Sequence, residues 1–500
     1  MKYFKEKYNL KKYVHFFSPN NVDIIKNMNT FLGNKGTGLM EMSKMNISVP
    51  PGFIITTDVC IYYLKKKKYK KEMFNQILYF IKKLEVTTKK KLGDKNNPLL
   101  VSVRSGSKVS MPGMMDTILN LGINDKSITG LLKYSKNEFF VYDCYQKFIS
   151  TFGIVVLNIN PRIFYDKKDE YIKKNNSNEL TIENLKLLID DFKNIIKNEK
   201  KIEFPQNPYT QLFMAINAIF KSWNNKRAKL YRSYNNISEN LGTAIIIQKM
   251  IYGNKNNLSG TGVVFTRNPS NGKKELFGEY LTKAQGEDLV SGLRTPYEIK
   301  MLKKSNLKIY NELVNVGKKL EKYYQDMQDI EFTIEDEKLF ILQTRSGKRT
   351  SKAAFKIAVD MVKEKLISKK KAILRITPKD IEKVLHTTID TNQKYEIIAT
   401  GLPASPGVVT GKIVFSSEMA KKLKSNGEKV ILIKKETSPE DIGGMYSSDG
   451  LLTSRGGMTS HAAVIGRGIG IPCVVGCKDL KINPSNSNIS IKNKILFEKD

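Results

Sequence analysis

Residues 453–464, which read TSRGGMTSHAAV, contain the side chain best suited to covalent chemistry. The chain has only three histidines, His15, His386 and His461, and His461 follows a Gly-Gly pair and a Thr-Ser pair. The Ala-Ala-Val run after it predicts a helix that begins at His461, where free backbone N–H groups and the helix dipole favour a phosphate. A histidine placed there is a candidate nucleophile that carries a phosphoryl group. The alternative is an ordinary capping or core histidine in a glycine-rich turn.

A second group of candidate residues lies in residues 329–345, which predict two strands joined by a polar turn. The first strand alternates polar and apolar residues, which is typical of a half-buried strand. Residues i and i+2 share a face, so Asp329 and Glu331 project together. If the turn has an odd number of residues, Glu331 lies opposite Gln343 and Asp329 opposite Arg345. Such oxygen ligands suit Mg²⁺ that bridges nucleotide phosphates, whereas the alternative is a solvated cross-strand salt bridge of little energetic weight.

Three further features could contribute to phosphate binding. Residues 259–262, Ser-Gly-Thr-Gly, predict a hairpin whose backbone N–H groups lie over phosphates, although such sequences are also common turns. Lys35 stands between two glycines, and Arg104 is expected at the end of a strand over residues 99–103. Both side chains could neutralise polyphosphate charge. For Lys35 the alternative is an ordinary surface lysine in a lysine-rich chain.

The loop around His461 resembles the corresponding loop of the phosphoenolpyruvate-utilising dikinases, and Met458 and Ser460 make it most similar to the pyruvate, phosphate dikinase branch. Other motifs resemble the same family, in the same order, from about residue 30 to about 480. They are VSVRSG at 101–106, SMPGMMDT at 110–117, SWNN at 222–225, GTGVVFTRNP at 260–269, GEY at 278–280, AQGED at 284–288, DMQDIEFT at 326–333 and QTR at 343–345.

The resemblance implies a set of site residues. It implies that His461 is the phosphorylated residue and that Mg²⁺ is held by Asp329, Glu331 and Gln343. It implies an ATP and phosphate site made of Lys35, Arg104, Gly113, Met115, Thr261, Glu279, Gln343 and Arg345, with Gly113 and Met115 in a loop near the adenine. Thr459 becomes a candidate regulatory phosphosite, because the matching threonine of plant members is phosphorylated. Added charge there would repel the incoming phosphoryl group; the alternative is a plain hydrogen-bonding hydroxyl.

The expected fold is a mixed α/β and α+β multidomain protein. Residues 1–350 are expected to form an ATP-grasp nucleotide-binding domain with a helical insertion at about 125–205. Residues 351–397 are expected to form a helical connector and hinge, and residues 398–500 a small swivelling phosphohistidine α/β domain that is truncated at its end. Nothing in the chain matches the C-terminal (β/α)₈ barrel through which the family binds pyruvate or phosphoenolpyruvate, so this chain alone is not expected to interconvert them.

The implied reaction transfers a pyrophosphoryl group from ATP to His461 and releases AMP. Inorganic phosphate then takes the outer phosphoryl group, which leaves phospho-His461 and pyrophosphate. One alternative is a water-dependent dikinase, similar to phosphoenolpyruvate synthase, in which water replaces phosphate. Another is an inactive fragment that acts as a binding module. Full-length members can be homodimers, through an interface that is expected to be absent here.

The net charge of +35 invites a nucleic-acid reading. However, only eleven of the 84 basic residues are Arg, and the lysines are spread along nearly the whole chain, so no specific nucleic-acid binding is expected. Arginine binds phosphate through a planar fork, and six arginines fall in or beside the motifs: Arg104, Arg267, Arg345, Arg349, Arg455 and Arg467. Four cysteines without a CxxC pair, no apolar run of membrane-spanning length and no signal sequence predict a cytoplasmic protein with reduced thiols, without zinc and off the membrane.

Overall fold

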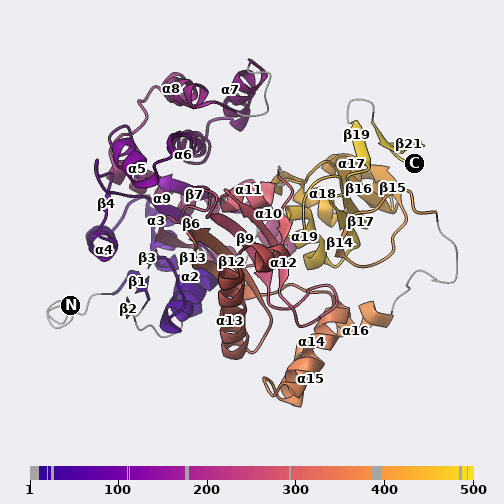
Figure 1. Ribbon diagram of the computed structural model, residues 1–500. Helices are drawn as coiled ribbons and strands as arrows, with labels where there is room; N and C mark the ends of the chain where they lie inside the picture. The colour runs from indigo at the N-terminus through magenta and orange to yellow at the C-terminus, as the bar shows by residue number, and fades with distance from the viewer. Residues whose placement is uncertain are drawn as a thin grey trace. The chain divides into compact units, whose positions relative to one another are not determined.

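The computed structural model describes residues 11–19, 21–23, 28–109, 111, 113–174, 180–291, 294–385, 396–483, 487–492 and 494–500. The chain forms two compact units, Met1–Ile251 and Tyr252–Asp500. Both units combine helices with β-sheets, so the expected mixed α/β multidomain architecture is confirmed (Figure 1). The division between the units lies inside the segment 1–350, and the predicted domain limits stay a prediction. His386 and the middle of the predicted hinge lie outside the described residues.

The first unit is built on a six-stranded antiparallel sheet in the order β2-β1-β3-β8-β6-β7. Aromatic and β-branched residues, such as VHFFS in β1 and AIIIQK in β8, favour strands and bury both faces at the centre of the sheet. The strands are β1 (Val14–Ser18), β2 (Asn21–Val22), β3 (Gly52–Ile55), β6 (Val101–Gly106), β7 (Thr117–Leu121) and β8 (Ala244–Lys249); β4 (Lys91–Leu92) and β5 (Pro98–Leu99) form a separate parallel pair.

Helices of the first unit include the predicted insertion. Between residues 125 and 205 the chain forms α5 (Ile128–Ser135), α6 (Glu138–Thr151), a π-helix (Phe152–Val156), α7 (Pro161–Lys174) and α8 (Ile182–Lys200), so the helical pattern expected there is confirmed. The remaining helices are α2 (Met28–Lys44), α3 (Thr57–Lys66), α4 (Lys71–Thr88), α9 (Pro208–Ser222), α10 (Lys226–Tyr234) and a 3₁₀ turn (Glu239–Leu241). Helix α9 begins where the sequence predicts, since Asn207 caps two backbone N–H groups and Pro208 occupies the first turn.

Trp223, the chain's single tryptophan, follows α9 and is almost fully buried in the first unit. Its indole Nε1–H donates a 2.9 Å hydrogen bond to the carbonyl of Glu239. The guanidinium of Arg232, on α10, lies 4.2 Å from the ring centroid. Arg232 also donates to the Trp223 carbonyl at 2.6 Å, so the ring is fixed by packing, by a hydrogen bond and by a cation–π contact.

The second unit starts with a five-stranded antiparallel sheet in the order β11-β10-β9-β12-β13. Its strands are β9 (Gly260–Phe265), β10 (Phe277–Thr282), β11 (Tyr297–Glu298), β12 (Gln328–Glu335) and β13 (Lys338–Ser346), and its helices are α11 (Gly286–Ser291), α12 (Ile299–Ser305) and α13 (Leu307–Tyr324). Strand β12 is buried along nearly its whole length. The prediction of a half-buried strand is therefore wrong, because β9 and β13 flank β12 on both sides and its outward residues are covered as well.

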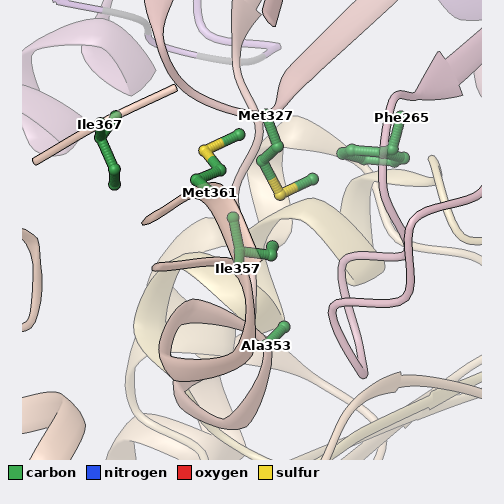
Figure 2. Packing of buried hydrophobic residues seen from close by; sticks show 6 residues of the cluster. All are labelled: Phe265, Met327, Ala353, Ile357, Met361 and Ile367. Atoms are coloured by element: carbon green, nitrogen blue, oxygen red, sulfur yellow. The ribbon is translucent and has the colours of Figure 1, made fainter. Parts of the chain in front are cut away.

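The connector after this sheet contains α14 (Ser351–Lys363), α15 (Lys369–Arg375) and α16 (Pro378–Leu385). Figure 2 shows how α14 is anchored: Ala353, Ile357 and Met361 pack with Phe265 of β9 and with Met327. Arg267 strengthens this anchor. Its buried guanidinium forms paired hydrogen bonds with the carboxylates of Glu321 and Glu364, at 2.8–3.0 Å.

The last part of the second unit is a small α/β arrangement in which β15, β16, β17 and β18 are parallel and β14 is antiparallel at the edge. The helices that follow these strands, α17, α18 and α19, lie against the sheet (Figure 1). The elements are β14 (Leu402–Ser405), β15 (Lys412–Val414), α17 (Ser417–Ser425), β16 (Val430–Lys434), a 3₁₀ turn (Pro439–Asp441), α18 (Ile442–Tyr446), β17 (Gly450–Thr453), α19 (His461–Ile469) and β18 (Cys473–Val475), then a three-stranded sheet of β19 (Leu480–Asn483), β20 (Asn488–Ile491) and β21 (Lys494–Phe497). Among the helices described, none has both the length and the apolar character of a membrane span.

Candidate functional site

The His461 loop, residues 454–460, connects β17 to α19. Gly456 has a φ of 104°, a left-handed conformation that favours glycine, and the hydroxyl of Thr453 donates to the carbonyl of Arg455 at 2.7 Å. Ser460 precedes the helix, and His461 is its first residue. The prediction that a helix begins at His461 is therefore confirmed, and the imidazole lies next to the unpaired N–H groups of the first turn.

The environment of His461 favours the uncharged imidazole. Its Nε2 atom is buried and has no hydrogen-bond partner among the described residues. Burial lowers the pKa of His461 to about 4, although the carboxylates of Asp441 and Glu440 oppose the shift. At neutral pH the ring is therefore neutral, and a ring nitrogen without a competing hydrogen bond can act as a nucleophile.

The His461 loop is held from two sides at Met458. The Met458 N–H donates to a carboxylate oxygen of Glu279 on β10 at 3.1 Å, and the Thr459 hydroxyl donates to the other oxygen at 3.3 Å. On the opposite side, Arg467 of α19 donates to the Met458 carbonyl at 2.7 Å and to the Ala404 carbonyl at 3.2 Å. Glu279, which the sequence analysis assigned to ATP and phosphate, thus contacts the His461 loop in this structure. Burial raises the pKa of Glu279 above the usual carboxyl value.

The hairpin of β12 and β13 pairs the predicted residues. Asp329 lies opposite Arg345, and Glu331 lies opposite Gln343, as expected. The stated condition is wrong, because the turn between the strands has two residues, an even number. A β-bulge next to Glu331 places Leu342 as an extra residue in β13, and this shifts the register by one. The bulge therefore produces the pairing that an odd turn would have produced.

The face formed by Asp329 and Gln343 has the features of a cation site. One carboxylate oxygen of Asp329 accepts a 2.7 Å hydrogen bond from Arg345. The other oxygen, and the amide oxygen of Gln343, are buried without a partner among the described residues. Burial raises the pKa of Asp329, although Arg345 opposes the shift. A buried acceptor left unpaired costs about 1–3 kcal/mol, and hard oxygen ligands suit Mg²⁺, so these residues fit the predicted metal.

The fit depends on more than carboxylates. Within the described ranges, no group of three His, Cys, Asp or Glu side chains is arranged to hold a metal ion. Gln343 and the oxygens of a bound phosphate chain would therefore have to complete the ligand set around Asp329 and Glu331, which is the usual way in which nucleotide-binding proteins hold Mg²⁺.

The sequence analysis missed Lys348, which follows β13. Its pKa is lowered by burial of the ammonium group and by the neighbouring charges of Arg345 and Arg467, while Asp329 opposes the shift. Three cationic side chains thus lie close enough to interact with the Asp329 region, and one of them, Arg467, comes from the helix that begins at His461. The only signal in the sequence was the position of Lys348 three residues after Arg345, which a chain rich in lysine makes inconspicuous.

The prediction of a phosphate-binding hairpin at residues 259–262 is wrong. Gly260, Thr261 and Gly262 belong to β9, whose backbone pairs with β10 on one side and β12 on the other. The Thr261 hydroxyl is buried and donates to the Phe332 carbonyl at 3.0 Å. A Cβ at Gly262 would lie 2.5 Å from the Phe332 ring, so this glycine is needed for packing rather than for phosphate contact.

The predicted site residues of the first unit lie on three elements. Lys35 is in α2, just after the kink at Gly33, and has an interaction partner within the protein. Arg104 lies inside β6 and not at the end of a strand, because the strand continues to Gly106. Gly113 has a φ of 71°. Next to Met115, the loop is pinned to α10 by Arg227, which donates to the Met114 carbonyl at 3.2 Å and forms an ion pair with Asp116.

The expectation that the scarce arginines hold phosphate is wrong for several of them. Arg267 is bound by two glutamates, as described above, and Arg349 forms two hydrogen bonds with Asp326 at 2.7 and 2.6 Å. Arg467 is used to fix the Met458 and Ala404 carbonyls. Each guanidinium fork is occupied by protein groups, which shows a structural use of the same bidentate geometry that suits phosphate.

A histidine at a helix N-terminus on a small parallel sheet, beside a hairpin with orphaned oxygen ligands, defines a multidomain protein of the phosphohistidine class. The family description "Pyruvate phosphate dikinase, AMP/ATP-binding domain" matches residues 29–91, 69–310 and 306–366, and "PEP-utilising enzyme, mobile domain" matches residues 426–493. These matches cover well over half of the chain. The chain belongs to the pyruvate, phosphate dikinase family.

Curated relatives agree with this assignment. The chain is 50% identical over 485 residues to the pyruvate, phosphate dikinase of Rickettsia prowazekii, which covers 95% of the chain and 55% of the relative. It is 45% identical over 491 residues to pyruvate, phosphate dikinase 2 of Oryza sativa, with 97% and 55% covered, and 45% identical over 499 residues to the enzyme of Clostridium symbiosum, with 98% and 56% covered. The chain spans about half the length of the curated relatives that it matches.

Proposed function

We propose that this chain carries out the ATP and phosphate part of the pyruvate, phosphate dikinase reaction, with His461 as the phosphorylated residue. The observation that carries the proposal is the neutral, buried imidazole of His461 with an unpartnered Nε2 atom at the start of α19. In the first step, His461 attacks the β-phosphorus of ATP, the bond between the α- and β-phosphates breaks, and AMP leaves. In the second step, inorganic phosphate takes the outer phosphoryl group, which gives phospho-His461 and pyrophosphate.

The charged side chains around the hairpin support the first step. Asp329, Glu331 and Gln343 would hold Mg²⁺, which when bound supplies positive charge that offsets the phosphate oxygens. Arg345 and Lys348 add fixed positive charge on the same side of the protein. Electrostatic stabilisation of this kind is the main source of rate enhancement in phosphoryl transfer.

The other residues of the predicted ATP site lie in the first unit, and their role is part of the same proposal. Lys35 and Arg104 would bind phosphate oxygens, and Gly113 and Met115 would lie near the adenine. Thr261 leaves the set, because its hydroxyl is used inside the sheet. The proposed domains are an ATP-grasp domain over residues 1–350, a hinge over 351–397 and a swivelling domain over 398–500.

Delivery of the phosphoryl group to pyruvate, to form phosphoenolpyruvate, is proposed for the whole protein type and not for the residues described here. The His461 loop would leave Glu279 for that step, since both hydrogen bonds between them join the loop to a different sheet. Thr459 would be a regulatory phosphosite in this scheme, because a phosphate on its hydroxyl cannot keep the contact with the Glu279 carboxylate.

An isotope experiment tests the proposal. ATP labelled at the β-phosphate should label the wild-type chain in an acid-labile, base-stable bond, and His461→Asn should abolish the label while ATP binding stays intact. ATP labelled at the γ-phosphate should label the protein only without inorganic phosphate, and added phosphate should release the label as pyrophosphate. Release of γ-label as inorganic phosphate, with no need for added phosphate, would indicate the water-dependent alternative. ATP binding without any protein label would indicate a binding module.

A further inference from the structure

A cavity of about 350 Å³ lies at the root of the connector, between the end of β13 and helices α14, α15 and α16. It has an apolar wall on α14 and a charged rim made by residues after β13 and around the end of α15. The volume falls in the range of protein sites for small organic ligands, which are mostly apolar with a few placed polar groups. None of the residues that the family resemblance assigns to ATP, phosphate or metal lines this cavity.

The charges on the rim are not balanced. Two guanidiniums share one carboxylate, since Arg349 binds Asp326 at 2.7 and 2.6 Å and Arg375 lies 3.5 Å from the same group. Asp380, the second carboxylate, accepts hydrogen bonds from the N–H and hydroxyl of Thr377 at the start of α16, where it also meets the positive end of the helix. Lys348 lines the cavity as a third cation and forms no ion pair or hydrogen bond with a described residue. The rim is therefore positive by one charge.

The apolar wall is preformed. Ala354, Ile357 and Ala358 face the cavity from α14, and Ile376 closes it from the turn after α15. Ile357 also belongs to the core cluster that anchors α14 to the nucleotide-side sheet (Figure 2). The two alanines leave space that a larger side chain would fill. A fixed apolar wall facing a positive rim is complementary to a ligand with a compact apolar body and one negative charge.

We infer that this cavity is a binding site for a small organic monocarboxylate, with the carboxylate at the Arg375 and Lys348 rim and the apolar body against α14. Such a ligand would contact residues after β13, on α14 and on α15 at once, and it would brace the connector where it leaves the sheet. The site is separate from the proposed ATP and phosphate residues, so the inference does not depend on the proposed function.

The test uses benzoate as the probe and benzamide as its neutral counterpart of the same shape. Binding of each to the 500-residue chain is followed by ligand-detected NMR. Ala358→Leu fills the apolar wall, and Val359→Leu is the matched control, because Val359 is the next residue of α14 and is 52% exposed. We expect saturable benzoate binding by the wild type and by Val359→Leu, at least tenfold weaker binding by Ala358→Leu, and at least tenfold weaker binding of benzamide by all three.

A second variant removes the charge and keeps the apolar wall. Arg375→Gln should weaken benzoate binding at least tenfold and leave the weak benzamide binding unchanged, and it decides the question if Ala358→Leu does not fold. Three results would each overturn the inference: no saturable benzoate binding by the wild type, equal affinities for benzoate and benzamide, or undiminished benzoate binding by a folded Ala358→Leu or Arg375→Gln chain.

Discussion

Replacing Glu279 by Gln should release the His461 loop from β10. The carboxylate accepts one hydrogen bond from the Met458 N–H at 3.1 Å and one from the Thr459 hydroxyl at 3.3 Å. Glutamine keeps one acceptor oxygen, so at least one hydrogen bond to a charged group is lost, at a cost of about 1.5–3 kcal/mol. Since about 1.4 kcal/mol corresponds to a factor of ten, the held loop becomes roughly 10- to 100-fold less populated.

The assay is the single-turnover rate of His461 labelling from β-labelled ATP, with ATP affinity measured separately. The rate should fall by the same factor while ATP affinity stays constant. The pH profile adds a second readout. Burial raises the pKa of Glu279 in the held loop, so the held loop binds a proton more tightly than the released loop does. Holding is therefore favoured at low pH and weakens as pH rises from the ordinary value of 4.5 through the raised pKa, and the Gln variant should lack this dependence.

A glycine variant tests whether the contact itself is responsible. A Cβ at Gly457 would overlap the Glu279 carboxylate, so Gly457→Ala must displace it and should reduce labelling to a similar extent. The double variant should be little worse than either single one, because both remove the same interaction. Gly286→Ala is the matched control, since an added Cβ there meets nothing within 4 Å. Wild-type labelling by Glu279→Gln, or additive effects in the double variant, would refute the reasoning.

Three other results are expected. Glu331→Gln and Gln343→Ala should each raise the Kd for Mg²⁺-ATP about tenfold, by loss of one ligand or hydrogen bond of about 1.4 kcal/mol; equilibrium dialysis with and without Mg²⁺ checks this, and an equal effect without the metal would contradict it. Thr459→Asp should slow His461 labelling at least tenfold, whereas Thr459→Ser should label normally, and rapid labelling of the Asp variant would count against inhibition by charge. NMR titration of His461 should give a pKa of about 4. Because the shift is downward, the buried neutral ring is favoured above the ordinary value of 6.5 and is lost as pH falls toward 4, and an unshifted pKa would disprove its burial.

Local signals in the sequence were sufficient for the His461 loop and for the site hairpin. A glycine pair followed by small helix formers fixes where α19 begins, because backbone freedom and helix propensity act over a few residues. The two-residue periodicity of strands likewise placed Asp329 and Glu331 on one face. The extra residue Leu342 could not be predicted, since a bulge depends on how the neighbouring strands pack and has no sequence signature of its own here.

Long-range partners explain the failures. A Gly-Thr-Gly segment is compatible with a turn or with a strand under an aromatic ring, and only the position of Phe332 decides between them. The same holds for Arg267, whose fork would suit phosphate but is filled by Glu321 and Glu364, 54 and 97 residues away in the sequence. The assignment of Glu279 to nucleotide binding failed for the same reason, because its contact with the His461 loop spans 179 residues.

The fixed position of Trp223 has a practical consequence. As the chain has a single tryptophan, and that ring is buried in the first unit against Arg232, intrinsic tryptophan fluorescence is an optical reporter of the first unit alone. Emission excited at the red edge of the absorption band, where tyrosine does not absorb, follows the unfolding of that unit during a denaturant titration. Far-ultraviolet circular dichroism follows both units, so the separation between the two transitions measures how far the second unit unfolds independently.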